Sequence, residues 1–266
     1  MANEGESPLP HSSFSHYPSI PPPLNLRLTE LPPRPCPYLP GRTAIDRAFW
    51  AEEIPGELYR QFMDASFRRS GKVVYQPICH GCRKCVQIRV PVDRFTPSKS
   101  QRRCWRKNSD VLVEISEPVV TAEKFRVYQA YSSKWHEAPL KETDESFRMF
   151  LYDSPVHTLE FAYRDVAGKL LGVGICDVDS ESLSSVYFYF DPAEARRGLG
   201  TYAALYELEY AKLNSLAYYY LGYWVDGCRT MEYKANYRPH ELLGTDGRWR
   251  EVADMHENSS TNADLP

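Results

Sequence analysis

The sequence predicts an α+β fold, with a mixed sheet and helices in the C-terminal half and a smaller, basic, cysteine-containing region before it. After His157 the pattern runs strand, strand, strand, helix, strand, helix, with turn residues between the strands. Between Arg60 and Asp110 there are thirteen Arg and Lys and three Asp, a balance of +10 in a chain of net charge -3. Four of the seven cysteines lie inside that segment, and three of them form a C-x2-C-x2-C run.

The composition is that of a folded protein that does not enter a membrane. The chain has 266 residues, of which 42% are hydrophobic, and this is enough for a sizeable core. No stretch is long and apolar enough to span a bilayer, and the first residues lack the charged and apolar regions of a signal peptide. The odd number of cysteines and their spacing favour reduced thiols or a metal site over a disulfide framework. We therefore expect a cytoplasmic protein.

Four segments are expected along the chain. Residues 1–33 are rich in Pro, Ser and His, and they are predicted as a disordered leader because proline fixes φ and lacks a backbone donor. Residues 34–118 form the predicted N-terminal domain, which is basic and contains the cysteine run. Residues 119–251 form the predicted C-terminal domain, and residues 252–266 are a flexible polar tail.

Within the N-terminal domain, the apolar pattern predicts one helix and three strands. Leu58, Phe62 and Ala65 recur at helical spacing and predict a helix over 56–66. The predicted strands cover 73–75, 87–92 and 111–117.

In the C-terminal domain, capping residues and periodicity predict helices around the strands. Thr121 caps a helix that reaches about Trp135, and Thr143 caps a second, shorter helix. Apolar residues at i, i+4, i+7 and i+11 from Leu199 predict a helix to Leu213. The remaining predicted elements are strands over 158–163, 170–178, 184–190 and 216–225, and a helix over 229–237.

The most basic stretch, residues 98–108, carries five Arg and Lys around Trp105. Because these cations neutralise phosphates and an aromatic ring can stack on a base, the stretch predicts a nucleic-acid contact. The alternative for the stretch is a surface strand and turn with Trp105 in the core. The alternative for the whole basic segment is a solvated face without a partner.

A second feature that could bind an anion lies between a predicted strand and a predicted helix. Gly198 and Gly200 let the backbone approach a phosphate, and the helix start offers N–H groups and the positive end of its dipole. Arg196 or Arg197 adds charge. The alternative is that the glycines serve packing alone.

Other side chains could serve catalysis or substrate binding. Glu160 and Asp177 lie on neighbouring predicted strands, where either could accept a proton from an attacking amine or stand in solvent. Lys234 and Tyr237 follow the last predicted strand of the sheet, and they could bind a carboxylate or protonate a leaving hydroxyl.

The cysteine run could bind a metal. Thiolates of Cys79, Cys82 and Cys85 can hold a soft metal ion or an iron–sulfur cluster, which usually has four ligands. A fourth ligand would be Cys36, Cys104 or His80. The alternative is a set of free, structural or redox-sensitive thiols.

Two resemblances extend these interpretations. The Arg196–Gly200 turn resembles the phosphate-binding turn of the GNAT acyltransferase fold, and the order of the following elements is similar to that fold. A longer set of motifs resembles the aminoacyl-tRNA–protein transferase family. They are Cys36-Pro-Tyr-Leu-Pro-Gly-Arg42, Phe67-Arg-Arg-Ser-Gly71, Tyr75-x-Pro77, Ser98-x-Ser-Gln-Arg-Arg103, Glu160-Phe-x-x-Arg164, Val186-Tyr187, Asp191-Pro192, Leu199-Gly-Thr-Tyr202, Tyr220-Leu-Gly-Tyr-Trp224, Gly227-Cys228, Tyr233-Lys234 and Tyr237-Arg-Pro239.

This resemblance covers roughly residues 34–245 and implies a function. The opening motif looks like the bacterial branch, whose members move leucine from leucyl-tRNA to proteins with N-terminal Asp or Glu and so mark them for N-degron proteolysis. It implies a GNAT-like C-terminal domain that binds the tRNA end in place of coenzyme A, with no cofactor required for transfer. Two departures stand out. Gln76 replaces a frequent Arg, and an Arg-Gly-Leu-Gly form at 197–200 replaces a common Ser-Leu-Gly form.

The resemblance also implies roles for individual residues. The catalytic residues would be Glu160, Tyr187 and Lys234. The substrate-binding residues would be Arg42, Tyr75, Arg102, Arg103, Arg106, Lys107, Arg196, Arg197, Gly198 and Gly200. Because recognition of a carboxylate needs a cation, the acceptor's Asp or Glu would meet Arg42, Arg103 or Lys234.

Three other functions remain open from the sequence. Arginyl transfer from arginyl-tRNA is the reaction of the eukaryotic branch. A coenzyme A-dependent N-acetyltransferase would explain the glycine turn but leave the basic segment idle. A metal-stabilised RNA-binding module would explain the cysteines and the charge but not the aromatic, GNAT-like half.

Overall fold

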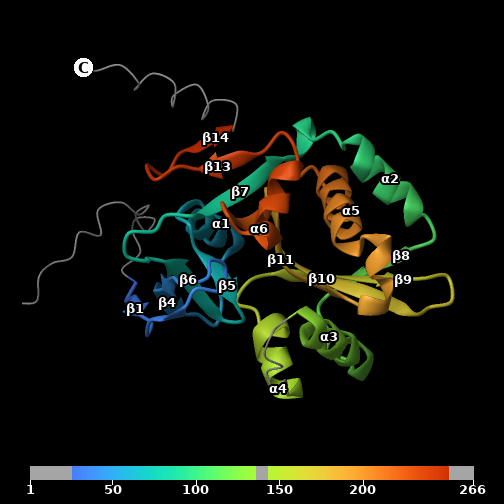
Figure 1. Cartoon of the computed structure of the whole chain (residues 1–266), viewed down its shortest axis with the longest axis horizontal. Helices are drawn as coiled ribbons and strands as arrows, with labels where there is room; N and C mark the ends of the chain where they lie inside the picture. Colours follow the sequence, from blue (N-terminus) through green and yellow to red (C-terminus); the bar gives the residue numbers. More distant parts are fainter. Residues whose placement is uncertain (1–25, 136–142, 252–266) are drawn as a thin grey trace, which may run out of the picture.

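The computed structural model describes residues 26–135 and 143–251, so most of the predicted leader and the whole predicted tail lie outside the described residues. An eight-stranded sheet in the order β14-β13-β7-β12-β11-β10-β9-β8 forms the centre of the fold. Helices α5 and α2 lie on one side of it, and α3 and α4 lie on the other (Figure 1). Strands β11 and β12 are parallel while the other neighbours are antiparallel, so the mixed sheet and the predicted α+β class are confirmed.

The elements of this larger unit have the following bounds. The strands are β7 (Cys85–Pro91), β8 (Leu112–Ser116), β9 (Thr158–Arg164), β10 (Leu170–Val178), β11 (Ser182–Phe190), β12 (Tyr218–Val225), β13 (Glu241–Leu243) and β14 (Trp249–Glu251). The helices are α2 (Lys99–Lys107), α3 (Ala122–Trp135), α4 (Asp144–Phe147), α5 (Leu199–Leu213) and α6 (Arg229–Glu232). Short 3-10 segments at Val92–Arg94, Pro192–Arg197 and Tyr233–Asn236 and a π-helical turn at Arg148–Tyr152 complete it.

Several predicted elements are confirmed within a residue or two. The hydroxyl of Thr121 accepts a hydrogen bond from the backbone N–H of Lys124 at 3.3 Å, as expected for the cap of α3. The predicted bounds of β10 and α5 are those observed. The helix predicted over 229–237 is present only as two short turns, α6 and the 3-10 segment after it.

The basic stretch 98–108 is a helix, so the alternative of a strand and turn is wrong. Ser98 and Gln101 form a capping box, in which each side chain accepts a hydrogen bond from the other residue's backbone N–H. The Ser-x-x-Gln spacing at 98–101 is therefore the feature of the sequence that indicates a helix start here. Trp105 is 38% exposed and lies beside Tyr202 and Tyr206 of α5, with ring centroids 5.4 and 6.2 Å away.

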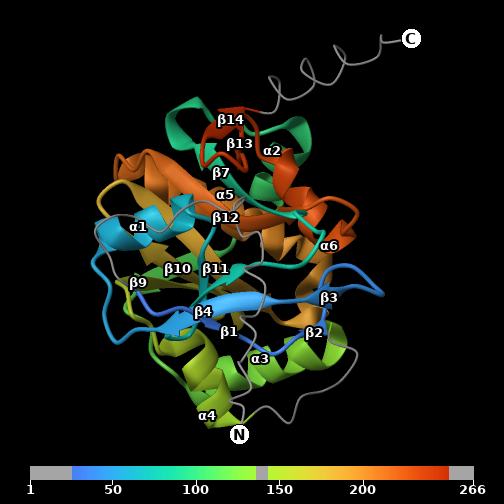
Figure 2. The same ribbon diagram turned by 90° about the vertical axis from the view of Figure 1, so that its left-hand side faces the viewer.

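A smaller unit of four strands stands beside the large sheet (Figure 2). Its strands are β1 (Thr29–Glu30), β4 (Asp46–Trp50), β5 (Arg68–Ser70) and β6 (Val73–Pro77), and α1 (Gly56–Asp64) covers it. Tyr59, Phe62 and Met63 of α1 pack on Phe67 and Val74 in its core. A further pair, β2 (Arg34–Pro35) and β3 (Thr43–Ala44), precedes β4. Strand β1 lies in the segment that was expected to be leader, and it pairs with β4.

The large sheet takes strands from both predicted domains. Strand β7 pairs with β12 along its whole length, and β8 pairs with β9 at the far edge, although β7 and β8 precede residue 118 in sequence. The boundary predicted at 118 therefore falls inside one structural unit. No helix in residues 26–135 or 143–251 is long and apolar enough to cross a bilayer.

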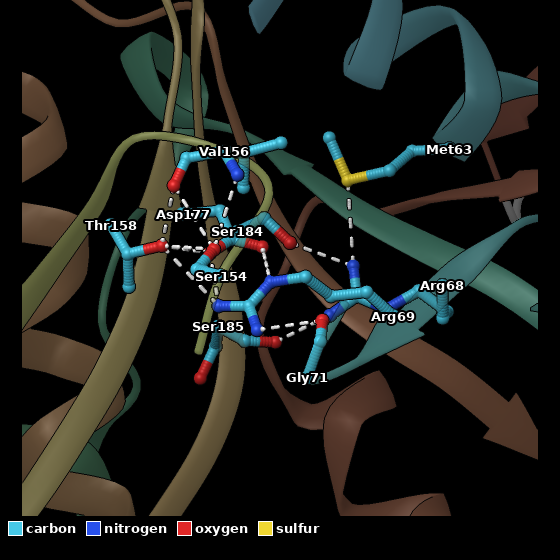
Figure 3. Close-up of polar contacts among 10 residues, drawn as sticks. All are labelled: Met63, Arg68, Arg69, Gly71, Ser154, Val156, Thr158, Asp177, Ser184 and Ser185. Carbon is cyan, nitrogen blue, oxygen red and sulfur yellow. Dashed lines mark hydrogen bonds and ion pairs between the residues drawn. The ribbon is translucent and has the colours of Figure 1, made fainter. Parts of the chain in front are cut away.

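Strand β5 joins the smaller unit to the large sheet (Figure 3). Arg69 donates to both carboxylate oxygens of Asp177 on β10, at 2.7 and 2.5 Å, and both residues are buried. The backbone N–H of Gly71 donates to the carbonyl of Phe150 at 3.0 Å. Gly71 has a φ of +58°, and a Cβ there would lie 2.1 Å from the carbonyl oxygen of Met149, so this close approach requires glycine.

Candidate active site between two diverging strands

The two parallel strands of the sheet separate partway along their length. Strands β11 and β12 pair from Ser182 and Tyr218 to Ser184 and Tyr220, and then the pairing stops although both strands continue. Their C-terminal ends lead into α5 and α6. Two facing strand edges are thus left without partner strands, and in open sheets such an opening beyond the carboxyl ends of parallel strands is a usual place for a ligand.

Arg68 of β5 reaches the point where these strands separate (Figure 3). Its Nη1 donates to the hydroxyl of Ser184 at 2.7 Å, and its Nη2 donates to the carbonyl of Ser185 at 2.6 Å. Arg68 is only 5% exposed. The smaller unit therefore contributes a buried cation to an opening that belongs to the large sheet.

Lys234 approaches the same opening from the side of β12. Its Nζ donates to the carbonyl of Tyr223 at 2.8 Å, and the residue is 8% exposed. Burial is the main cause that lowers the pKa of Lys234 to about 7, and the positive charge of Arg68 acts in the same direction. Gly222 has a φ of +81°, and a Cβ there would lie 3.6 Å from both Arg68 Nε and Lys234 Nζ.

Tyr187 lies on β11 beyond the last residue that pairs with β12, and it is half-buried. Its ring meets those of Phe150 and Tyr131, with centroids 5.1 and 6.4 Å away. Tyr131 also contacts Phe190 at the end of β11, at 5.2 Å. These aromatic rings line the α3 side of the diverging strands, so Tyr187 is placed on the opening by its strand.

The Arg196–Gly200 turn has the geometry of an anion site at the start of α5. Gly198 is the N-cap of this helix with a φ of +72°, and both glycines are exposed. Arg196 is exposed, so its charge is available to a ligand. Arg197 is engaged instead, because it binds both carboxylate oxygens of Asp110 at 2.9 Å and Glu194 at 3.1 Å.

Helix α2 is fastened to this turn. The side-chain amide of Asn108 donates to the carbonyl of Arg197 at 3.0 Å, and the ammonium of Lys107 donates to the carbonyl of Arg196. Arg103 and Arg106 are exposed on the helix, as is Arg102, which also donates to a backbone carbonyl. A pocket of about 310 Å³ lies between α2 and α5 and is lined by Val92, Phe95, Pro97, Arg102, Trp105, Arg106, Leu205, Leu208, Glu209 and Lys212. The predicted basic stretch and the predicted anion turn thus form one continuous surface.

Glu160 lies apart from this opening. It is 1% exposed on β9, where its carboxylate binds the ammonium of Lys124 from α3. Burial raises the pKa of the Glu160 carboxyl above its ordinary value, while the Lys124 charge opposes that rise. The structure therefore does not bring Glu160 together with Lys234. Asp177, which the sequence left as a proton acceptor or a solvated group, is neither, because it is buried against Arg69.

Tyr75 and Arg42, both predicted to bind substrate, differ in their burial. Tyr75 of β6 is half-buried, and its ring lies 6.4 Å from that of Tyr223 on β12, so it borders the opening. Arg42 is exposed in the turn before β3, and it takes part in none of the contacts described above. Gln76, at the position where the family often has Arg, is fully buried and donates to the carbonyl of Ala65 at 2.5 Å, which is a structural role.

The three cysteines of the run lie near one another and near Cys36. Cys36, Cys79 and Cys82 all contribute to the raised pKa of the Cys85 thiol, which burial raises most, to about 12. The sulfur of Cys79 is engaged with the backbone of Ile45. Among residues 26–135 and 143–251, no three His, Cys, Asp or Glu side chains are arranged to hold a metal ion. The predicted ligand set therefore does not fit a metal as it is arranged.

The contribution of β5 was not predicted from the sequence, because the Phe67–Gly71 motif assigns no role to either of its arginines. Two adjacent arginines in a short strand before a glycine were the available signal. The two arginines have different partners because neighbouring side chains of a strand point to opposite faces. Arg68 points to the opening, and Arg69 points to Asp177.

Comparisons with known proteins agree with the motifs. A family described as arginine-tRNA-protein transferase, N terminus, matches residues 34–103, and its counterpart described as C terminus matches residues 123–244. Three curated relatives carry the name aspartate/glutamate leucyltransferase. The protein of Hahella chejuensis is 38% identical over 218 residues, covering 81% of this chain and 93% of that protein. The proteins of Saccharophagus degradans and Stenotrophomonas maltophilia are each 39% identical, over 223 and 238 residues, covering 82% and 86% of this chain and 94% of each relative.

Solved structures are more distant. The crystal structure of FemX has a TM-score of 0.49 and 8% identity, covering 81% of this chain and 74% of that chain. A GCN5-related N-acetyltransferase from Kribbella flavida has a TM-score of 0.35 and 14% identity, covering 70% and 63%. The classification rests on the two family matches and on the large share of each chain over which the curated relatives align. The chain belongs to the arginine-tRNA-protein transferase family, in the branch of the aspartate/glutamate leucyltransferases.

Proposed function

We propose that this protein transfers leucine from leucyl-tRNA to the α-amine of proteins that begin with Asp or Glu. The observation that carries the proposal is the similarity to proteins named aspartate/glutamate leucyltransferase, which reaches 39% identity over 238 residues. The leucylated product would enter N-degron proteolysis in the cytoplasm, as the family resemblance implies. The reaction as proposed uses no metal or cofactor.

The surface made by α2 and the Arg196–Gly200 turn supports a tRNA donor. Exposed Arg103 and Arg106 are suited to the phosphates of an acceptor stem, and the start of α5 with Arg196 is suited to a phosphate near the tRNA end. Trp105 borders the pocket between α2 and α5, where an aromatic ring can stack on a base. The end of the tRNA would then lie close to the diverging strands.

The reaction is aminolysis of the ester that links leucine to the terminal ribose. The acceptor nitrogen bonds to the leucyl carbonyl carbon, the bond from that carbon to the ribose oxygen breaks, and a proton passes from the nitrogen to the ribose oxygen. Because an α-amine has a pKa of about 7.7–8, a useful fraction is neutral without a strong base. Acceleration would come from positioning the two substrates and from donors aimed at the developing oxyanion. The unpaired edge of β11 beyond Ser184 offers backbone N–H groups for that purpose.

Coenzyme A-dependent acetyl transfer is a second candidate, favoured by the Gly198–Gly200 turn. This reaction would leave the basic surface of α2 without a ligand. Coenzyme A would meet only Arg196 of the two arginines in the turn, because Arg197 already binds Asp110 and Glu194. Arginyl transfer from arginyl-tRNA would use the same surfaces. The tRNA donor is therefore the better-supported class, and leucine follows from the named relatives.

Replacement of Arg102, Arg103 and Arg106 by alanine is expected to weaken binding of the charged tRNA. Each lost phosphate contact should reduce the slope of log K against log salt by about one, so the triple variant should lose about two to three units of slope. The measurement is the KM for charged tRNA, or its binding constant, as a function of salt concentration.

The matched control is an R126A/R148A variant, which removes exposed cations from the α3 and α4 side of the sheet. Its salt slope should equal that of the wild type. An unchanged slope in the α2 variant, with circular dichroism showing an intact fold, would rule out this surface as the tRNA site.

A further inference from the structure

The buried cations of this protein are not all alike. Among the described residues, the Lys and Arg side chains in the buried class are Arg68, Arg69, Arg89, Lys124 and Lys234. Three of them bind a carboxylate: Arg69 binds Asp177, Arg89 binds Glu241 at 2.8 Å, and Lys124 binds Glu160. Arg68 and Lys234 make no ion pair within 4.0 Å in the part of the chain that the structure describes.

Burial of an unpaired charge lowers the stability of the folded protein, and burial of two like charges side by side lowers it further. Removal of a cation from water is compensated only when an anion or enough hydrogen-bond acceptors replace the water. Arg68 and Lys234 face each other at Gly222, since a Cβ there would be 3.6 Å from a nitrogen of each. The lowered pKa of Lys234 reflects this environment. The other buried cations among the described residues are paired, so this pair indicates a site for an anion that residues 26–135 and 143–251 do not supply.

Both cations retain donors for such an anion. The guanidinium of Arg68 carries five N–H groups, and its side-chain partners are Met63, Ser184 and Ser185. Lys234 carries three N–H groups, of which one donates to the carbonyl of Tyr223. Because residue 222 is a glycine, β12 has no side chain that would fill the space beside the two cations.

We propose that Arg68 and Lys234 bind the side-chain carboxylate of the acceptor's N-terminal Asp or Glu. The proposal rests on the function proposed above and names the residues that read the acceptor. A carboxylate oxygen could be shared by the guanidinium and the ammonium, and the buried charges would then be balanced. The acceptor's α-amine, a few bonds away from that carboxylate, would lie in the opening beside Tyr187.

A phosphate of the tRNA fits this place less well. A phosphodiester carries two ribose substituents and needs room on both sides, whereas a carboxylate is a terminal group that needs room on one side only. Phosphate-binding features lie elsewhere, on the exposed side chains of Arg103, Arg106 and Arg196. Arg42 and Arg103, which the sequence offered as partners of the acceptor carboxylate, are exposed, so they do not need an anion to balance a buried charge.

The test compares R68M and K234M with the wild type on two peptides that differ only in an N-terminal Glu or Gln. Leucyl-tRNA is the donor, and the assay is run at pH 6.5, where Lys234, with a pKa of about 7, is mostly protonated. The expected result is a fall of about 100-fold or more in kcat/KM for the Glu peptide in each variant. The ratio of kcat/KM for the Glu peptide to that for the Gln peptide should fall toward one, and the KM for leucyl-tRNA should remain within about twofold of wild type.

Two further variants show whether a loss of activity comes from the loss of the buried cation or from misfolding. R68K keeps the charge and should recover part of the activity toward the Glu peptide. R60M removes a cation that also links the smaller unit to the large sheet, through Asp179 and Glu181, but lies outside the opening. It should leave the preference for Glu over Gln unchanged, and thermal unfolding of every variant reports its folded state.

The possible results separate the two levels of the proposal. If R68M and K234M are folded and transfer leucine to the Glu peptide as well as wild type does, the carboxylate site is wrong while leucyl transfer stands. If instead the KM for leucyl-tRNA rises and the preference for Glu over Gln is kept, the buried cations bind a tRNA phosphate. If the wild type transfers leucine to neither peptide, the proposed function itself fails.

Discussion

Replacement of Arg69 by methionine is expected to lower the free energy of unfolding by about 3–5 kcal/mol. Arg69 and Asp177 are both buried, and the variant would leave the Asp177 carboxylate in the interior without its cation, with the hydroxyl of Thr158 donating to it at 2.8 Å. An unpaired buried charge is destabilising to this degree because neither water nor a counter-ion replaces the lost guanidinium. Chemical denaturation followed by circular dichroism measures the change.

The control is the double variant R69M/D177L, which removes both charges. Apolar residues of similar size often replace a buried ion pair without loss, so the double variant should regain most of the stability that R69M loses. A loss below about 1 kcal/mol in R69M, the range of an exposed pair, would contradict this account of how the smaller unit is attached. The attachment matters for function because the neighbouring residue, Arg68, enters the opening.

The second large effect is expected at Glu160, where Gln should destabilise the fold by about 3–5 kcal/mol and spare the chemistry. The variant leaves the ammonium of Lys124 buried without a carboxylate, and the carbonyl of Val119 at 2.7 Å still accepts a hydrogen bond from it. The double variant K124M/E160Q should recover much of the lost stability. The measurements are the unfolding free energy and kcat for leucyl transfer at a temperature where each variant is folded.

This experiment decides between two roles for Glu160. The sequence resemblance implied catalysis, whereas the structure buries the carboxylate against Lys124 and away from Lys234. A stable E160Q protein without transfer activity would favour the catalytic role. A destabilised protein that keeps its kcat would confirm that Glu160 maintains the packing of α3 on the sheet.

The sequence predicted the large sheet better than the unit beside it. Strands β9, β10 and β11 and helix α5 have long apolar patterns and clear turn signals, so their periodicity was sufficient. Strand β7 was also predicted, but periodicity does not say which strand it pairs with, and its pairing with β12 crosses the predicted domain boundary. Strands β1 and β13, of two and three residues, are too short to leave a pattern.

The candidate site was predictable only where local sequence fixes local geometry. The Gly198–Gly200 turn and the basic residues of α2 were found because a glycine turn and a charge cluster are visible in sequence. Their contact through Asn108 was not visible, because it joins segments 89 residues apart. The position of Arg68 beside Lys234 depends on two long-range pairings, and spacing in the sequence carries no information about either.

The measurement that tests the central claim most directly is a comparison of donors with the wild-type protein. Peptides that begin with Asp or Glu are incubated with labelled leucyl-tRNA, labelled arginyl-tRNA or labelled acetyl-coenzyme A. The account predicts label on the peptide α-amine from leucyl-tRNA alone. Label from acetyl-coenzyme A or from arginyl-tRNA, with none from leucyl-tRNA, would contradict it.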